Sequence, residues 1–113
     1  MTVILMNWED MTLVASGHAG GGEKGQDIIC AGISALTQAL LFTLQDAKKR
    51  GRCALKWKID EDSGDLRIDC RPYSGYYAEI RAYFRVIMKG LNSMAEVYPE
   101  NIKIGEVWTS GNL

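Results

Sequence analysis

The residues of this chain best suited to chemistry are its single histidine, His18, and a cysteine twelve positions later, Cys30. A cysteine attacks a carbonyl carbon as its thiolate, whereas a free thiol, with a pKa of about 8.5, is mostly protonated at neutral pH. An imidazole within hydrogen-bonding distance can take the thiol proton or form an ion pair with the thiolate. The two side chains therefore predict a cysteine nucleophile with a histidine base, provided that the fold brings them together.

The segment between these two residues is rich in glycine. Residues 17–26 contain no large apolar side chain, and half of them are glycine, namely Gly17, Gly20, Gly21, Gly22 and Gly25. This composition predicts a mobile loop, which would let a substrate backbone approach closely. Its N–H groups are also candidates for an oxyanion site.

A long amphipathic helix is predicted to follow this loop. We expect Asp27 to be its N-cap, so that Cys30 lies in the first turn, where unpaired N–H groups and the helix dipole favour an anion. The Asp27 carboxylate opposes this effect as a nearby negative charge unless capping uses it, which is the role we expect. Helical spacing places Asp27, Cys30 and Ser34 on one face, so Ser34 is a candidate contact for substrate or an orienting water.

The whole sequence predicts an α+β fold in the order ββαββαβ, with two amphipathic helices packed on an antiparallel or mixed sheet. Strands are expected at residues 3–6, 11–15, 55–60, 66–71 and 102–108, with the first two and the middle two forming hairpins. The first helix should run from Ile28 to a C-cap at Gly51, and the second should lie between Pro72 and Pro99. Residues 1–113 are expected to form one domain with a frayed tail at 109–113.

Each predicted helix carries one apolar stripe. In the first helix the stripe is Ile29, Ile33, Leu36, Leu40, Leu44 and Ala47. In the second helix it is Tyr77, Ile80, Phe84, Ile87, Leu91 and Met94. We expect these two stripes to face the sheet.

Composition and charge limit the possible classes. A formal net charge of −1 gives no argument for a nucleic acid or a membrane surface as partner, and direct nucleic-acid binding is not expected. Three cysteines cannot form a fully paired disulfide framework. We find no signal peptide and no apolar run near the length of a membrane span, so we expect a reduced, cytoplasmic protein.

The motif around the two reactive residues resembles a known family. Gly17-His18-Ala19, followed after a gap by Asp27-Ile28-Ile29-Cys30-Ala31-Gly32-Ile33-Ser34-Ala35-Leu36, is similar to the signature of the ribosomal-processing cysteine proteases, called Prp. In that family GHA is followed by G-x-D-I-V-C-A-A-V-S-A-L, and Gly25 and Asp27 match its G-x-D. One departure is Gly20-Gly21-Gly22, where family members commonly carry a bulky residue, so the substrate sequence is left open.

The resemblance implies a small homodimeric endopeptidase that removes the N-terminal extension of a large-subunit ribosomal protein. It assigns Cys30 as the nucleophile and His18 as the general base and then acid. Gly17, Asp27 and Ser34 correspond to residues near that dyad. A phage- or prophage-encoded relative, acting on a capsid or scaffold protein, is an alternative within the same family.

The remaining cysteines and the known metal and phosphate motifs bear on the alternatives to a peptidase. Cys53 and Cys70 lie in the predicted strand hairpin and are expected to be core residues. One histidine and three scattered cysteines without C-x-x-C do not make a zinc set, and the pattern G-x-x-x-x-G-K-[ST] is absent, so no metal or cofactor is expected. The alternative class is a non-catalytic ribosome-associated or assembly-factor binding module.

Two basic clusters and a tyrosine cluster leave further questions. Lys48, Lys49, Arg50 and Arg52 form one basic cluster, and Arg81, Arg85 and Lys89 form the other. Both are read as solvated helix faces, with contact to an acidic partner or to RNA as the alternative. Tyr73, Tyr76 and Tyr77 either wall a peptide groove, mediate dimer contacts or are ordinary boundary aromatics.

Overall fold

A computed structural model describes residues 1–17, 24–60 and 62–108, and for residues 24–27 it describes the backbone alone. The elements follow the predicted order ββαββαβ: β1 (Thr2–Asn7), β2 (Thr12–Ser16), α1 (Lys24–Lys49), β3 (Cys53–Asp60), β4 (Asp65–Pro72), α2 (Tyr77–Val97) and β5 (Ile102–Val107). The predicted α+β class is thus confirmed.

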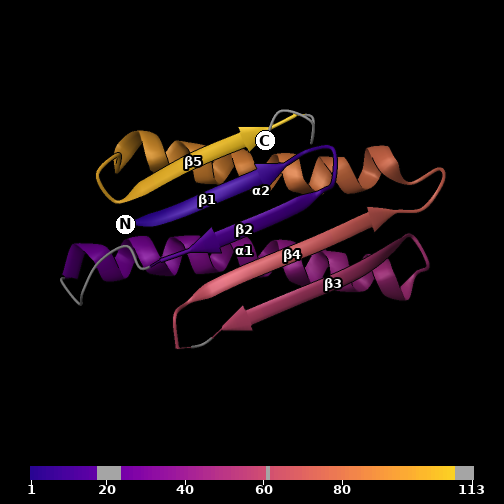
Figure 1. The fold of residues 1–113 in the computed structure, drawn as a ribbon, viewed down its shortest axis with the longest axis horizontal. Coiled ribbons are helices and arrows are strands. Elements are labelled where there is room, and N and C mark those ends of the chain that lie inside the picture. Colours follow the sequence, from indigo (N-terminus) through magenta and orange to yellow (C-terminus); the bar gives the residue numbers. More distant parts are fainter. Residues whose placement is uncertain (18–23, 61, 109–113) are drawn as a thin grey trace.

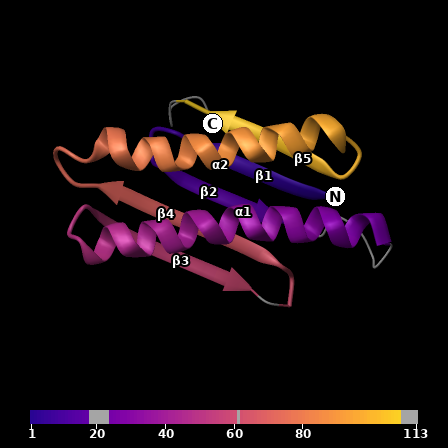
Figure 2. The same cartoon turned by 180° about the vertical axis from the view of Figure 1, so that it is seen from behind.

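The five strands form one mixed sheet in the order β3-β4-β2-β1-β5. The predicted hairpins β1–β2 and β3–β4 are antiparallel, as is the pairing of β2 with β4, whereas β5 pairs with β1 in parallel. Figures 1 and 2 show the sheet as one layer and both helices as a second layer on one of its faces.

The connections explain why both helices lie on the same face. Helix α1 links the parallel strands β2 and β3, and α2 links the parallel strands β4 and β5. Such crossovers are almost always right-handed. The strands of the second crossover run antiparallel to those of the first, and the second crossover moves across the sheet in the opposite direction. Because these two reversals cancel, two right-handed crossovers place both helices on the same face of the sheet.

The core lies between the helices and that face of the sheet. Alternate residues of the central strands point into it, including Ile4 and Met6 of β1, Leu13 of β2 and Ile68 of β4, all fully buried. The opposite sheet face carries half-buried or exposed side chains such as Leu5 and Arg67. This alternation is the period-two pattern from which the strands were predicted.

Helix α1 begins earlier than expected. It starts at Lys24, so Gly25 and Asp27 lie within the helix, and the predicted N-cap at Asp27 is wrong. Its end agrees with prediction: Gly51 has φ +75°, its N–H bonds to the carbonyl of Lys48, and the N–H of Arg52 bonds to the carbonyl of Ala47. This pair of bonds is the Schellman motif, for which glycine is favoured.

The hydropathy of α1 also differs from expectation. Residues Ile28–Lys49 have the length and the mean hydropathy, 1.7, of a segment that could cross a membrane. The prediction that no apolar run approaches that length is therefore wrong. Here the apolar stripe of the helix packs on the sheet, with Ile29, Ile33, Leu40, Leu44 and Ala47 buried and Leu36 half-buried.

Two apolar stripes are shorter than predicted. In α2 the residues Ile80, Phe84, Ile87 and Leu91 are buried, but Tyr77 in the first turn is exposed. In β3 the period-two pattern predicts that Leu55, Trp57 and Ile59 share one face with Cys53. Cys53 and Leu55 are buried, whereas Trp57 and Ile59 are about half exposed. The second half of β3 is thus not covered by the helix layer.

Candidate active site

Cys30 lies in the second turn of α1, where it packs against the edge of the core and remains half-buried. The sequence predicted it in the first turn, among the unpaired N–H groups of the helix start. Because the influence of the helix dipole falls off within the first turn, that part of the predicted activation is not supported.

The helix is closely packed beside this cysteine. Gly32, two residues further on, faces Met94 of α2, whose terminal carbon would lie 2.8 Å from a Cβ built at position 32. Met94 therefore fills the space that a side chain at position 32 would take. This contact places the C-terminal part of α2 beside the second turn of α1, which the sequence did not reveal.

Ser34 lies one turn beyond Cys30 on α1, and its side chain is exposed. Asp27 lies one turn before the cysteine in the same helix, although its side chain is outside the described part of the structure. The spacing of Asp27, Cys30 and Ser34 along one helix thus agrees with prediction. Their contacts with a substrate remain a prediction.

Gly17 directly follows β2 at the start of the glycine-rich segment. Its N–H donates a 3.0 Å hydrogen bond to Oδ1 of Asp65, the first residue of β4, and its φ is +83°. His18, together with Gly20, Gly21 and Gly22, lies outside the described residues. Nothing in the sequence indicated a contact between Gly17 and Asp65, because the two residues are 48 positions apart.

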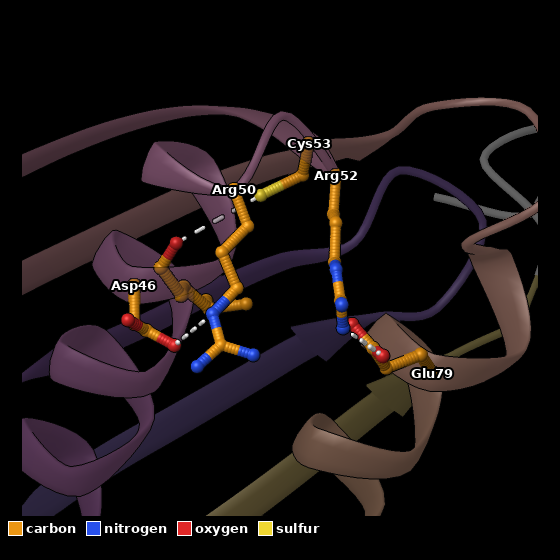
Figure 3. Close-up of polar contacts among 6 residues, drawn as sticks. Asp46, Arg50, Arg52, Cys53 and Glu79 are labelled. Atoms are coloured by element: carbon orange, nitrogen blue, oxygen red, sulfur yellow. Dashed lines mark hydrogen bonds and ion pairs between the residues drawn. The ribbon is translucent and has the colours of Figure 1, made fainter.

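The other two cysteines are core residues, as predicted. Cys53 and Cys70 are 1% and 4% exposed, and the Cys53 thiol donates to the carbonyl of Leu44 at 3.8 Å (Figure 3). Burial, together with the neighbouring Cys53 thiol, raises the pKa of Cys70 well above its ordinary value. A thiol in this setting stays protonated and inert. Cys30 is the only one of the three cysteines that is within reach of solvent.

Comparison with known proteins identifies the family. The family model for the cysteine protease Prp matches residues 2–103, which is almost the whole chain. The chain belongs to this family. It is therefore a cysteine peptidase, and the expected resemblance is confirmed. No curated protein matches the sequence.

Solved structures share the fold of this Prp-family chain. SMU.848 from Streptococcus mutans is 23% identical with a TM-score of 0.74, and the match covers 96% of this chain and 93% of that one. The essential ribosomal processing protease Prp from S. aureus, in complex with a covalently linked product peptide, is 24% identical with a TM-score of 0.73. The same protease with a substrate peptide is 23% identical. Each match to the S. aureus protease covers 94% of this chain and 99% of the other.

In this Prp-family chain most of the first basic cluster is occupied by contacts within the molecule. Arg50 pairs with Asp46 at 3.1 Å, and Arg52 donates to Oε1 of Glu79 at 2.5 Å, joining the end of α1 to the first turn of α2 (Figure 3). The Lys48 ammonium lies 5.9 Å from the centre of the Trp57 ring. These contacts favour a structural role for the cluster over a partner surface.

The second basic cluster contains a residue held by aromatic rings. The Arg81 guanidinium lies 5.1 Å from the centre of the Trp8 ring and 5.6 Å from that of Trp108, and it donates to the Tyr77 hydroxyl at 3.0 Å. The two indoles are themselves stacked with centroids 5.3 Å apart. Arg81 thus joins α2 to the ends of β1 and β5, while Arg85 and Lys89 are exposed.

The tyrosine cluster lies at the end of the molecule opposite Cys30. The Tyr76 ring contacts the guanidinium of Arg52, which follows the C-terminal end of α1. About 28 Å of helix separates that end from Cys30. Tyr73, Tyr76 and Tyr77 therefore do not wall a groove beside this cysteine within one chain, as Figure 2 also shows for the β4–α2 connection and the start of α1.

Two hollows of the described surface are also remote from the cysteine. One, of about 630 Å³, lies on the open face of the sheet and is lined by residues such as Thr12, Lys56 and Arg67. The other, of about 200 Å³, lies beside Arg81 and Trp108. Among the described residues, no group of three or more histidine, cysteine or acidic side chains is close enough to hold a metal ion.

Proposed function

We propose that this protein is a cysteine endopeptidase in which Cys30 is the nucleophile and His18 its general base and acid. The proposal rests on the difference in burial among the three cysteines. Cys53 and Cys70 are in the core, whereas Cys30 is accessible on the helix that follows the Gly17-His18 segment. A peptidase of this family requires an accessible thiol, and only Cys30 supplies one.

The proposed reaction is acyl transfer in two steps. The Cys30 thiolate attacks the peptide carbonyl carbon, a C–S bond forms, and the C–N bond breaks as His18 gives its proton to the leaving amine. Water then attacks the thioester while His18 accepts its proton, so that the C–S bond breaks and releases a carboxylic acid. The enzyme returns to its starting state, and the net change is hydrolysis of one peptide bond.

The remaining predicted site residues have supporting roles in this proposal. Gly17 directs the chain into the segment that carries His18, and Asp27 and Ser34 lie one turn to either side of Cys30 on α1. Gly20, Gly21, Gly22 and Gly25 are proposed to allow the peptide backbone to approach the thiol. Of these four glycines, only Gly25 lies in an element of the described structure, in the first turn of α1.

We further propose that the substrate is the N-terminal extension of a large-subunit ribosomal protein, cleaved in the cytoplasm by a homodimer. The family membership supports this proposal, as does the fold shared with the ribosomal processing protease Prp from S. aureus. A phage capsid or scaffold protein is the alternative substrate. The departure at Gly20-Gly21-Gly22 leaves the cleaved sequence open.

The test is cleavage of synthetic peptides that span such a ribosomal extension, followed by mass spectrometry. We expect Cys30→Ala to abolish cleavage and His18→Ala to lower the rate of cleavage by a factor of about 10² to 10⁴. Cys53→Ala is the matched control, because the same substitution in the core lowers stability without removing the nucleophile. Continued cleavage by Cys30→Ala would disprove the mechanism, whereas cleavage of a capsid or scaffold peptide alone would change only the substrate.

A further inference from the structure

Gly17, the residue directly before His18, makes one hydrogen bond to a side chain and has no room for a side chain of its own. Its N–H donates to Oδ1 of Asp65 at 3.0 Å. A Cβ built on Gly17 would lie 2.5 Å from the carbonyl oxygen of Met1, which is backbone at the start of β1. With φ at +83°, only glycine fits this position without strain.

The sheet topology explains these two contacts. Strand β2 lies between β4 and β1, so its last residues have β4 on one side and the start of β1 on the other. Ala15 of β2 pairs with Leu66 of β4, and Val3 of β1 pairs with Ser16. By continuation of these two pairings, Asp65 and the residues that precede Val3 lie next to the end of β2, within reach of Gly17.

Asp65 is itself held by an ordered turn. It pairs with Asp60 across the β3–β4 hairpin, and its N–H donates to Oγ of Ser63 at 3.3 Å. Within the turn, Oδ1 of Asp60 accepts the N–H groups of Asp62 and Ser63, at 3.0 and 3.3 Å. These hydrogen bonds hold the pKa of Asp60 below its ordinary value, so the turn keeps its charged acceptor at neutral pH.

We propose that Asp65 is a positioning residue of the peptidase: its carboxylate holds the Gly17 N–H and so sets the direction in which the chain leaves β2 towards His18. The proposal rests on the proposed role of His18. The hydrogen bond requires an acceptor oxygen at the position of Oδ1. Since a displacement of about 1 Å in catalytic geometry can cost about a hundredfold in rate, an anchor one residue before the base affects the chemistry.

The test uses two variants of Asp65 and one control. Asp65→Ala removes the acceptor, whereas Asp65→Asn keeps an oxygen at Oδ1. Asp62→Ala is the matched control, because it removes a carboxylate from the same turn. Residue 62 donates to Asp60 through its backbone N–H, so this hydrogen bond is kept in the variant. Thermal unfolding of all three variants verifies that they are folded at the temperature of the assay.

The principal measurement is the rate at which iodoacetamide alkylates Cys30, followed as a function of pH. We expect Asp65→Ala to slow alkylation at pH 7 about tenfold, since a displaced His18 would no longer assist the thiol. Asp65→Asn and Asp62→Ala should stay within about twofold of the wild type.

A second measurement reports on the anchor itself. Amide hydrogen exchange of Gly17, followed by NMR, should be faster in Asp65→Ala than in Asp65→Asn, because only the alanine variant lacks the acceptor. In a His18→Ala background, Asp65→Ala should cause no further change in the alkylation profile, since the anchor acts through His18.

The outcomes separate the two proposals. If His18→Ala shifts the profile and Asp65→Ala does not, the positioning role of Asp65 is wrong and the dyad stands. Equal slowing by Asp65→Asn and Asp65→Ala would also overturn the positioning role, as it would point to charge alone. If neither His18→Ala nor Asp65→Ala moves the profile, both the dyad and the positioning role fail.

Discussion

At the scale of single residues, the three cysteines differ in accessibility far more than in type. Cys30 is half-buried at the edge of the core, whereas Cys53 and Cys70 lie inside it, on strands covered by the helix layer. Burial raises the pKa of Cys70, and the neighbouring Cys53 thiol raises it further. Reactivity in this protein should therefore be concentrated at one sulfur.

Alkylation of the folded protein at neutral pH provides a direct check on this difference. We expect Cys30 to be labelled at least about a hundredfold faster than Cys53 or Cys70, because the buried thiols react only when the structure opens. Peptide mass spectrometry of the labelled protein gives the three rates. In urea the three rates should become similar, and comparable rates in the folded protein would contradict the assignment of burial.

At the scale of elements, α1 combines a glycine inside the helix with a glycine at its end, and the two have different physical roles. Gly32 faces the flexible end of Met94, which can move aside to admit a methyl group. Gly51 has open space around it but a φ of +75°, which a residue with a side chain adopts only with strain. The same substitution should therefore have opposite effects at the two positions.

We expect Gly32→Ala to stabilise the protein by about 0.5–1 kcal/mol, since alanine has the higher helix propensity. Gly51→Ala should destabilise it by about 1 kcal/mol, because it loses the favoured residue of the Schellman motif. Urea unfolding followed by circular dichroism measures both. Destabilisation by Gly32→Ala would mean that the packing of α1 against α2 is too rigid for Met94 to adjust.

The ion pair between Arg52 and Glu79 connects the end of α1 to the start of α2 and gives a pH dependence. The hydrogen bond from Arg52 holds the pKa of Glu79 below its ordinary value of 4.5. A carboxyl group with a lowered pKa in the folded state contributes stability above that ordinary value, and the contribution is lost as the pH falls through the folded-state pKa. The contact should therefore stabilise at pH 7 and lose this contribution as the pH falls below 4.5.

Glu79→Gln tests this contribution. At pH 7 the variant should unfold at a lower urea concentration than the wild type, and the difference should shrink as the pH falls below 4.5. Asp46→Asn is the control, because the Asp46–Arg50 pair is about 60% exposed and should contribute no more than about 0.5 kcal/mol. A difference between wild type and Glu79→Gln that does not change with pH would contradict the role of the charge.

At the scale of the whole molecule, both helices shield one face of the sheet and leave several apolar side chains outside. Ile28 and Phe42 on α1 and Val86 on α2 are 60–69% exposed. The chain measures 45 × 30 × 22 Å, with Cys30 towards one end of the long helices and the tyrosine cluster at the other. A second copy of the chain, as proposed from the family, would not need to displace any part of this core.

Sedimentation equilibrium tests the proposed homodimer. We expect a species of twice the 12.6 kDa mass of the chain at micromolar concentration. The mass should persist in the Cys30→Ala variant, because association does not require the nucleophile. A single species at 12.6 kDa throughout the concentration range would show that this chain does not share the proposed association.

Much of the architecture follows from the sequence alone. The change from period two to steps of three and four predicts the order ββαββαβ, and Gly51 predicts the end of α1, because both signals depend on residues close together in the chain. The spacing of Gly17, His18, Asp27, Cys30 and Ser34 likewise led to the family, which the match over residues 2–103 confirms. Local periodicity and motif spacing determined these properties.

Only the tertiary structure determined which distant segments meet. The parallel pairing of β5 with β1, the contact of Met94 with α1 and the hydrogen bond from Gly17 to Asp65 join residues that are remote in sequence. The exposure of Trp57 and Ile59 depends on how far the helices extend over the sheet, and the early start of α1 left Cys30 outside the first turn. These features depend on packing between elements, for which neither periodicity nor motif spacing carries a signal.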